Sequence, residues 1–157
     1  MTEIDFIFAR TDEEYELSKK IFLEYAEELG FDLCFQNFEE EIKFIKTQYG
    51  KPKGGIILIK LNNDIIGCIG VRKLENRVGE LKRMYIKRTF RNKGYGKELL
   101  YKAIELAREF NYKKLRLDTL PTMDKAIKLY KEAGFIEIEP YRYNPITETI
   151  FFELEIE

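Results

Sequence analysis

The sequence predicts an α+β fold with one sheet and about four helices, and three observations lead to this class. The chain has 157 residues, 45% of them hydrophobic, which is enough for one sizeable core, so we expect a single domain over residues 1–157. Two β-branched runs and a third strand-like segment follow one another in the middle of the chain, joined by short polar turns. Four other segments repeat apolar residues at helical spacing.

The first third of the chain predicts a strand and two helices. Its opening residues alternate between polar and apolar, as in a half-buried strand. Capping residues and glycines then mark where two helices begin and end. The expected elements are a strand at 4–9, a helix from Thr11 or Asp12 to Gly30, and a helix from Asn37 to a glycine-containing break at 49–55.

The middle of the chain predicts three consecutive strands. Two β-branched runs lie at residues 56–61 and 65–73, and a third strand is expected from about 78 to 87. Their connections at 62–64 and 75–77 contain the asparagines and charged residues that are typical of tight turns. Strands connected so closely pair with their neighbours, so we expect an antiparallel meander.

The remainder of the chain predicts alternating helices and strands after a glycine-rich loop at residues 91–96. The helix that follows the loop carries its apolar residues on one face. The expected elements are this helix, ending near Phe110, a strand at 115–118, a helix at 123–133 that Gly134 ends, and a strand pair around 135–138 and 149–156.

Charge is distributed unevenly along the chain, although the formal net charge is only -1. Residues 1–50 contain 13 acidic and 5 basic residues, a balance of -8, whereas residues 72–131 contain 7 acidic and 18 basic residues, a balance of +11. The middle of the chain is therefore expected to meet an anion. The acidic first third weakly favours a cationic acceptor, with solvated helix faces as the ordinary alternative.

The composition also excludes several classes of protein. No apolar run approaches the roughly 20 residues of a membrane span, and the first ten residues are too acidic for a secretory signal, so we expect a cytoplasmic protein without a membrane partner. Cys34 and Cys68 have no metal-ligand spacing and are expected to be packing residues. Histidine is absent, which removes serine-histidine and cysteine-histidine pairs, and we predict no metal site.

The loop at residues 91–96 carries the clearest chemical signal. Glycines at 94 and 96 permit positive φ and close approach of a ligand, while Arg91, Lys93 and Lys97 add full positive charges. Backbone amides at the start of a helix bind phosphate well, because the helix dipole adds partial positive charge there. The alternative is an ordinary tight turn into a surface helix.

Residues 81–96 resemble the strand-loop-helix core of the GNAT superfamily of N-acetyltransferases. The family's loop pattern, Arg or Gln, any two residues, Gly, any residue, Gly or Ala, is met by Arg91, Gly94 and Gly96. A second family block is similar to residues 126–135, at the expected distance downstream. The resemblance covers residues 56–138 well, and residues 141–145 resemble a motif in some bacterial branches.

The resemblance implies an acetyl-CoA-dependent enzyme with a mixed, mostly antiparallel sheet. In that family the strand at 84–86 splays from its parallel neighbour at 115–118, and the wedge receives cofactor and acceptor. Pantetheine would pair with the backbone of 84–86, and the pyrophosphate would lie on the amides of 92–97. The implied cofactor-binding residues are Met84, Tyr85, Ile86, Arg91, Asn92, Lys93, Gly94, Tyr95, Gly96 and Lys97. Met123 departs from the family, because many relatives have a cofactor-binding asparagine there.

Two residues are candidates for catalysis. Direct attack requires a neutral amine and a proton for the departing thiolate. Tyr130 matches the family tyrosine that protonates or hydrogen-bonds this thiolate, with core packing as the alternative. Glu80 matches a position where several relatives keep a base or a water-holding carboxylate; alternatively it is a hairpin-edge residue paired with Arg77 or Lys82.

Five residues are candidates for binding the acceptor. Asp118 lies at the end of its strand and would bind a cationic acceptor or cap the turn that follows. Arg83 would reach an acceptor carboxylate, unless it is a solvated residue of the sheet face. Tyr141, Tyr143 and Asn144 would wall the pocket, with core tyrosines and a turn asparagine as the alternative.

The expected activity is acetyl transfer from acetyl-CoA to a primary amine through a ternary complex, with the amine on a small molecule or a protein. Two other functions stay open. One is a non-catalytic sensor of coenzyme A with the same fold, and the other is a nucleic-acid-binding domain that uses the basic stretch and its tyrosines. The second requires more assumptions, so we expect no nucleic-acid partner. The predicted assembly is a monomer or homodimer.

Overall fold

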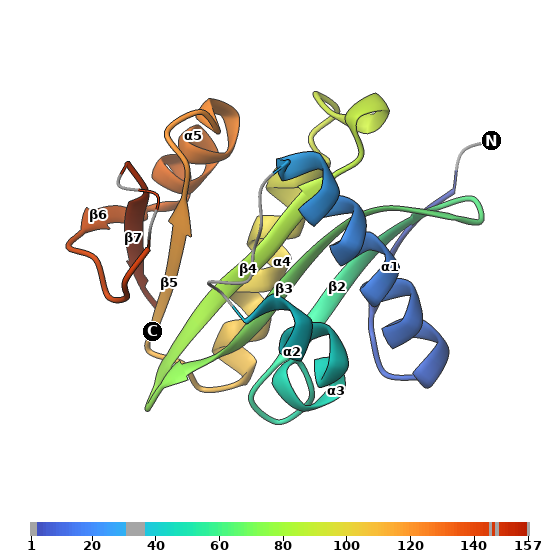
Figure 1. The fold of residues 1–157 in the computed structure, drawn as a ribbon, viewed down its shortest axis with the longest axis horizontal. Coiled ribbons are helices and arrows are strands. Elements are labelled where there is room, and N and C mark those ends of the chain that lie inside the picture. Colours follow the sequence, from blue (N-terminus) through green and yellow to red (C-terminus); the bar gives the residue numbers. More distant parts are fainter. Residues whose placement is uncertain (1–2, 31–36, 145, 147, 157) are drawn as a thin grey trace.

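The computed structural model describes residues 3–30, 37–144, 146 and 148–156, and it contains one seven-stranded sheet (Figure 1). The predicted Cys34 packing position lies outside the described residues. The strands lie in the order β1-β2-β3-β4-β5-β7-β6, and all neighbours are antiparallel except β4 and β5. They are β1 (Ile4–Phe8), β2 (Gly55–Leu61), β3 (Asp64–Glu75), β4 (Val78–Ile86), β5 (Lys114–Thr119), β6 (Ile136–Ile138) and β7 (Ile150–Glu155).

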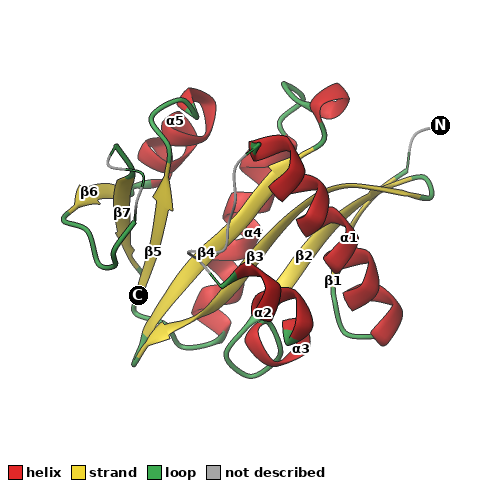
Figure 2. Ribbon diagram, in the orientation of Figure 1, coloured by secondary structure: helices red, strands yellow, loops and turns green. Residues whose placement is uncertain are grey.

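In the described part of the chain, five α-helices cover the two faces of this sheet (Figure 2). One face packs against α1, α2 and α3, and the opposite face packs against α4 and α5. The helices are α1 (Asp12–Leu29), α2 (Phe38–Lys43), α3 (Ile45–Gln48), α4 (Tyr95–Glu109) and α5 (Asp124–Ala133). None of the described helices is long and apolar enough to cross a membrane.

Most helix boundaries follow from the residues that cap them. Thr11 and Glu14 form a reciprocal capping box at the start of α1, and Gly30 ends this helix with φ at 74°. Gly134 ends α5 in the same left-handed conformation, with φ at 107°. The sequence interpretation of these two helices, including the capping residue of α1, is confirmed.

The second predicted helix differs from the structure. The helix is interrupted at Phe44, whose ψ of 34° breaks the helical path, so α2 and α3 replace the one expected element. Asn37 precedes α2 but makes no capping bond through its side chain, because its own backbone is left-handed with φ at 56°. The consequence is a compact corner that brings Glu41, Ile45 and Tyr49 onto the sheet.

Two apolar cores form on the two faces of the sheet. The larger core joins α4 and α5 to the sheet and includes Leu99, Ala103 and Leu115, all fully buried. The smaller core lies under α1 and α3 and includes Phe22, Tyr49 and Cys68, which are also fully buried. The predicted role of Cys68 as a packing residue is therefore confirmed.

Candidate active site

The parallel strands β4 and β5 separate partway along their length (Figure 1). They pair only where Val78–Glu80 lies beside Lys114–Arg116, although β4 continues to Ile86 and β5 to Thr119. The predicted splay of the central strands is confirmed. Past this point no strand among the described residues pairs with the edge of β4 that faces β5, and buried backbone groups need hydrogen-bond partners.

A cleft occupies the space where the two strands diverge. Both strands line it, together with α1, α5 and the segment before β7. The lining residues are Tyr25 and Leu29 from α1, residues 81–84 from β4, residues 117–119 from β5, Leu120, Met123, Ala126 and Tyr130 near or on α5, and Asn144, Ile146 and Thr149. The cleft therefore combines apolar walls with a few charged groups, as binding sites usually do.

A bulge in β4 changes which side chains face this cleft. Arg83 has a φ of 59°, and the register with β3 shifts there, so β4 contains one extra residue. The Cys68 thiol of β3 donates a hydrogen bond to the backbone carbonyl of Arg83 at 3.2 Å. Lys82 and Arg83 therefore do not alternate across the sheet as neighbouring residues of a regular strand do, and both line the cleft.

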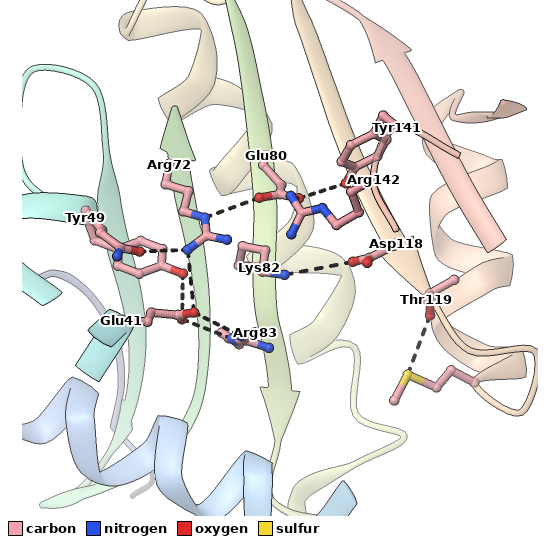
Figure 3. Close-up of polar contacts among 12 residues, drawn as sticks. Glu41, Tyr49, Arg72, Glu80, Lys82, Arg83, Asp118, Thr119, Tyr141 and Arg142 are labelled. Carbon is pink, nitrogen blue, oxygen red and sulfur yellow. Dashed lines mark hydrogen bonds and ion pairs between the residues drawn. The ribbon is translucent and has the colours of Figure 1, made fainter. Parts of the chain in front are cut away.

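Arg83 is held by a buried carboxylate of α2 (Figure 3). Its Nε and Nη2 donate to the two Glu41 oxygens at 3.0 and 2.7 Å, and the Glu41 side chain is completely buried. Arg72 and the Tyr49 hydroxyl also donate to Glu41. Burial would raise the pKa of Glu41, but the hydrogen bond and charge of Arg83 outweigh it and lower the pKa.

Glu80 lies at the centre of a second group of donors. It accepts hydrogen bonds from Arg72 Nε at 3.2 Å, from the Tyr141 hydroxyl at 2.8 Å and from Arg142. Burial opposes its charge, but the nearby cations, Lys82 first, lower the pKa of Glu80 to about 2. A carboxylate held in this way is a weak base, and it connects β3, β4 and the segment after β6.

Lys82 and Asp118 face each other from β4 and β5 (Figure 3). Lys82 Nζ lies 3.9 Å from Asp118 Oδ1, and their side chains are 3% and 8% exposed. Burial lowers the pKa of Lys82 to about 8, partly offset by the charge of Glu80. In the described part of the chain, Asp118 Oδ2 has no hydrogen-bond partner although it is buried.

Tyr130 reaches the same cleft from α5. Its ring packs edge-on against Phe135 and beside Phe152, and only 7% of the residue is exposed. Burial raises the pKa of Tyr130, and the charge of Asp118 raises it further, so the hydroxyl stays protonated. A protonated hydroxyl in an apolar wall is a suitable hydrogen-bond donor.

The segment before β7 contributes unequally to the cleft. Asn144 lines it and accepts a hydrogen bond from the Ile146 amide at 2.9 Å, so it also has the predicted turn role. Tyr141 points to Glu80 and packs against Phe151, so it fixes the segment. Tyr143 is 82% exposed and lies outside the cleft lining, so the structure does not bring it to the acceptor cleft.

The glycine-rich loop lies at the start of α4. Gly94 has a φ of 86° with open space where a Cβ would stand, and no side chain of the described residues caps the helix. Lys93 and Lys97 are exposed, and Lys125 of α5 donates to the Asn92 side chain. The Arg91 side chain binds the Ile86 carbonyl and Glu28, so it anchors the loop to β4 and α1 and does not extend from it.

Three residues of the site were not identified from the sequence. Lys82 and Lys125 looked like ordinary basic residues, and Glu41 looked like one of three acidic residues in a first helical turn. A signal for Glu41 was present, because it stands four residues before Ile45 and eight before Tyr49, on the buried face. No comparable local pattern marks Lys82, since the bulge that directs it depends on the pairing of β3 and β4.

Comparisons with known proteins agree with this geometry. The chain matches the Acetyltransferase (GNAT) family over residues 12–135. It is 33% identical to an uncharacterized N-acetyltransferase of Schizosaccharomyces pombe over 140 residues, which cover 88% of this chain and 86% of the relative.

Two solved structures are similar over nearly the whole chain. The crystal structure of a GNAT acetyltransferase from Staphylococcus aureus has a TM-score of 0.80 and 24% identity, and the match covers 99% of this chain and 100% of the other. A GNAT acetyltransferase from Elizabethkingia anophelis, with acetyl-CoA bound, has a TM-score of 0.65 and 25% identity over 99% of this chain and 98% of the other. The chain therefore belongs to the acetyltransferase (GNAT) family and is an acetyl-CoA-dependent N-acetyltransferase.

Proposed function

We propose that this enzyme transfers the acetyl group of acetyl-CoA to a primary amine by direct attack in the cleft between β4 and β5. The observation that carries the proposal is the convergence of Tyr130 and Asp118 on a cleft beside an unpaired strand edge. The first is a protonated hydroxyl and the second is a carboxylate with an open oxygen. Amide formation needs both a proton donor for the leaving thiolate and an acceptor for the amine proton.

The residues present are suited to hold coenzyme A. The free edge of β4 beyond Glu80 offers backbone donors and acceptors to an extended pantetheine, as to an added strand. At the start of α4, the uncapped amides and the open space at Gly94 suit a pyrophosphate. Lys93, Lys97 and Lys125 add positive charge around the loop.

We assign different roles to Tyr130 and Asp118, which line the cleft, and to Glu80, which lies beside it. Tyr130 donates a hydrogen bond to the departing sulfur, and Asp118 accepts one from the attacking nitrogen. Glu80 acts as a positioning residue, because Arg72, Tyr141 and Arg142 already donate to its carboxylate. It fixes the segment that carries Asn144 over the cleft.

The test is an acceptor screen in which release of the coenzyme A thiol is measured. The panel contains small amines, amino acids, diamines and lysine peptides, and each is tested with the parent enzyme and with Asp118→Asn. We expect turnover with at least one amine and a loss of roughly 100-fold or more in the variant, the usual size of a general acid-base contribution. Binding of acetyl-CoA without turnover of any amine would instead support a sensor.

A further inference from the structure

In the cleft, the positive side chain of Lys82 lies next to the negative side chain of Asp118. The 3.9 Å between Lys82 Nζ and Asp118 Oδ1 is the distance of an ion pair and is longer than a hydrogen bond. They come from two strands that no longer pair at this point. Both side chains line the same cleft as Tyr130.

The hydrogen bonding of Asp118 indicates which kind of ligand group should bind beside it. Asp118 Oδ2 is buried and has no hydrogen-bond partner in the described residues. A buried charged oxygen without a donor is costly, and such groups in native proteins usually have a binding or catalytic explanation. The amine of the acceptor is a donor of the required kind, and it also needs a group to accept its proton.

The surroundings of this carboxylate have an excess of positive charge. Among the described residues, the ion pairs around the cleft involve four cations and three carboxylates. The cations are Arg72, Lys82, Arg83 and Arg142, and the carboxylates are those of Glu41, Glu80 and Asp118. Arg83 and Arg72 are directed toward the two glutamates, and Lys82 lies within ion-pair distance of Asp118.

The protonation of Lys82 supports the same conclusion. Burial lowers the pKa of Lys82 to about 8, which means that its ammonium form is stabilised less than it would be in water. An anionic group bound beside Nζ would restore this stabilisation. The cleft is therefore suited to a ligand that brings a carboxylate to Lys82 and an amine to Asp118.

We propose that the acceptor is an α-amino acid, whose amine binds Asp118 Oδ2 and whose carboxylate binds Lys82. The inference rests on the proposed acetyl transfer and narrows its substrate. In an α-amino acid the nitrogen and the carboxyl carbon are two covalent bonds apart, about 2.5 Å. The ammonium and carboxylate groups of the amino acid are therefore close enough to bind Asp118 and Lys82, which are adjacent and carry the opposite charges.

The same arrangement disfavours the other acceptor classes. A diamine or polyamine would bring a second cation toward Lys82 and Arg83, which is unfavourable in a buried site. The side chain of a protein lysine has no carboxylate within reach of its amine. Specificity then comes from repulsion as well as attraction.

The test compares each amino acid with the amine that remains when its α-carboxylate is removed. The pairs are L-leucine with 3-methylbutylamine, L-phenylalanine with phenethylamine, and L-aspartate with β-alanine, and 1,5-diaminopentane is added. We expect kcat/KM to favour the amino acid of at least one pair by roughly 10- to 100-fold, the size of one hydrogen bond to a charged group. The diamine should be a poor acceptor.

Lys82→Met then tests the carboxylate subsite. The ratio of kcat/KM within a pair should fall toward one, because the ratio compares two substrates of the same preparation and is independent of how much enzyme is folded. Lys82→Arg should keep part of the preference. Lys60→Met, which changes a half-buried lysine of β2, is the matched control and should leave the ratio as in the parent.

The outcomes separate the two proposals. If the parent acetylates the amines as well as the amino acids, or if Lys82→Met keeps the full preference, the amino-acid inference is wrong while acetyl transfer to amines stands. If no member of any pair and no other amine releases the thiol, the proposed function itself is contradicted.

Discussion

The two sides of the cleft are built in different ways. The proposed coenzyme A side uses backbone groups of nearby residues, along the free edge of β4 and at the start of α4. The proposed acceptor side uses side chains from α2, β3, β4, β5 and the segment before β7. A backbone site therefore needs only local conformation, whereas a side-chain site needs the whole fold in place.

The largest effect that distinguishes the two sides should come from Glu41→Ala. This change leaves Arg83 buried without its carboxylate and removes one of the two carboxylates that Arg72 contacts, and breaking a buried ion pair in this way costs roughly 3–5 kcal/mol. We expect the midpoint of urea unfolding to fall accordingly. Glu40→Ala on the exposed side of α2 is the control and should stay within about 0.5 kcal/mol of the parent. Equal stability of the two variants would show that the network adds nothing.

The dependence of stability on pH below about pH 5 should test the hydrogen-bond donors that surround Glu80. The pKa of Glu80 is lowered to about 2 from an ordinary value near 4.5, so its contribution is present above pH 4.5 and is lost as the pH falls toward 2. A difference of this size corresponds to about 3 kcal/mol. Glu80→Gln should therefore lose less stability than the parent between pH 5 and pH 3.

An exposed glutamate provides the control for this measurement. Glu137→Gln on β6 should show the same loss of stability with falling pH as the parent when unfolding is followed by denaturant titration at each pH. If the stability of Glu80→Gln falls with pH in the same way as that of the parent, the neighbouring cations do not hold the Glu80 carboxylate of the parent in its charged form.

Tyr130→Phe should lower turnover roughly tenfold or more, since the hydroxyl that donates to the leaving sulfur is removed while the ring packing stays. The expected signature is a lower kcat with little change in the KM for acetyl-CoA, measured by thiol release. Tyr101→Phe on the exposed face of α4 is the control. A parent-like kcat in Tyr130→Phe would limit this residue to a packing role.

The same contrast explains what could be predicted from the sequence. The order of strands, the capping of α1 and the glycine-rich start of α4 all depend on neighbouring residues, and the structure has them. The roles of Arg83 and Glu80 depend on side chains that are 42 and 62 residues away in the chain, Glu41 and Arg142. Neighbouring residues alone do not reveal such long-range contacts. For the same reason the sequence does not identify Lys82 as a site residue, and it places Tyr143 at a cleft that this residue does not line.

The smallest effect, and the sharpest test of the backbone side, should come from Gly94→Ala compared with Gly30→Ala. Both glycines have positive φ, 86° and 74°, and an added Cβ meets nothing within 4 Å at either position. The backbone strain of the two variants should therefore be similar, roughly 1–2 kcal/mol. Only Gly94 lies at the start of α4, where the proposed pyrophosphate would approach.

We therefore expect the two variants to lose similar stability but to differ in affinity. Calorimetric titration with coenzyme A should show binding weakened by about tenfold in Gly94→Ala, or about 1.4 kcal/mol, and unchanged in Gly30→Ala. Because strain is matched, a difference in affinity can only come from the space that the methyl group occupies beside the amides. Equal affinities would place the phosphates away from this helix, and the division between a backbone side and a side-chain side would no longer hold.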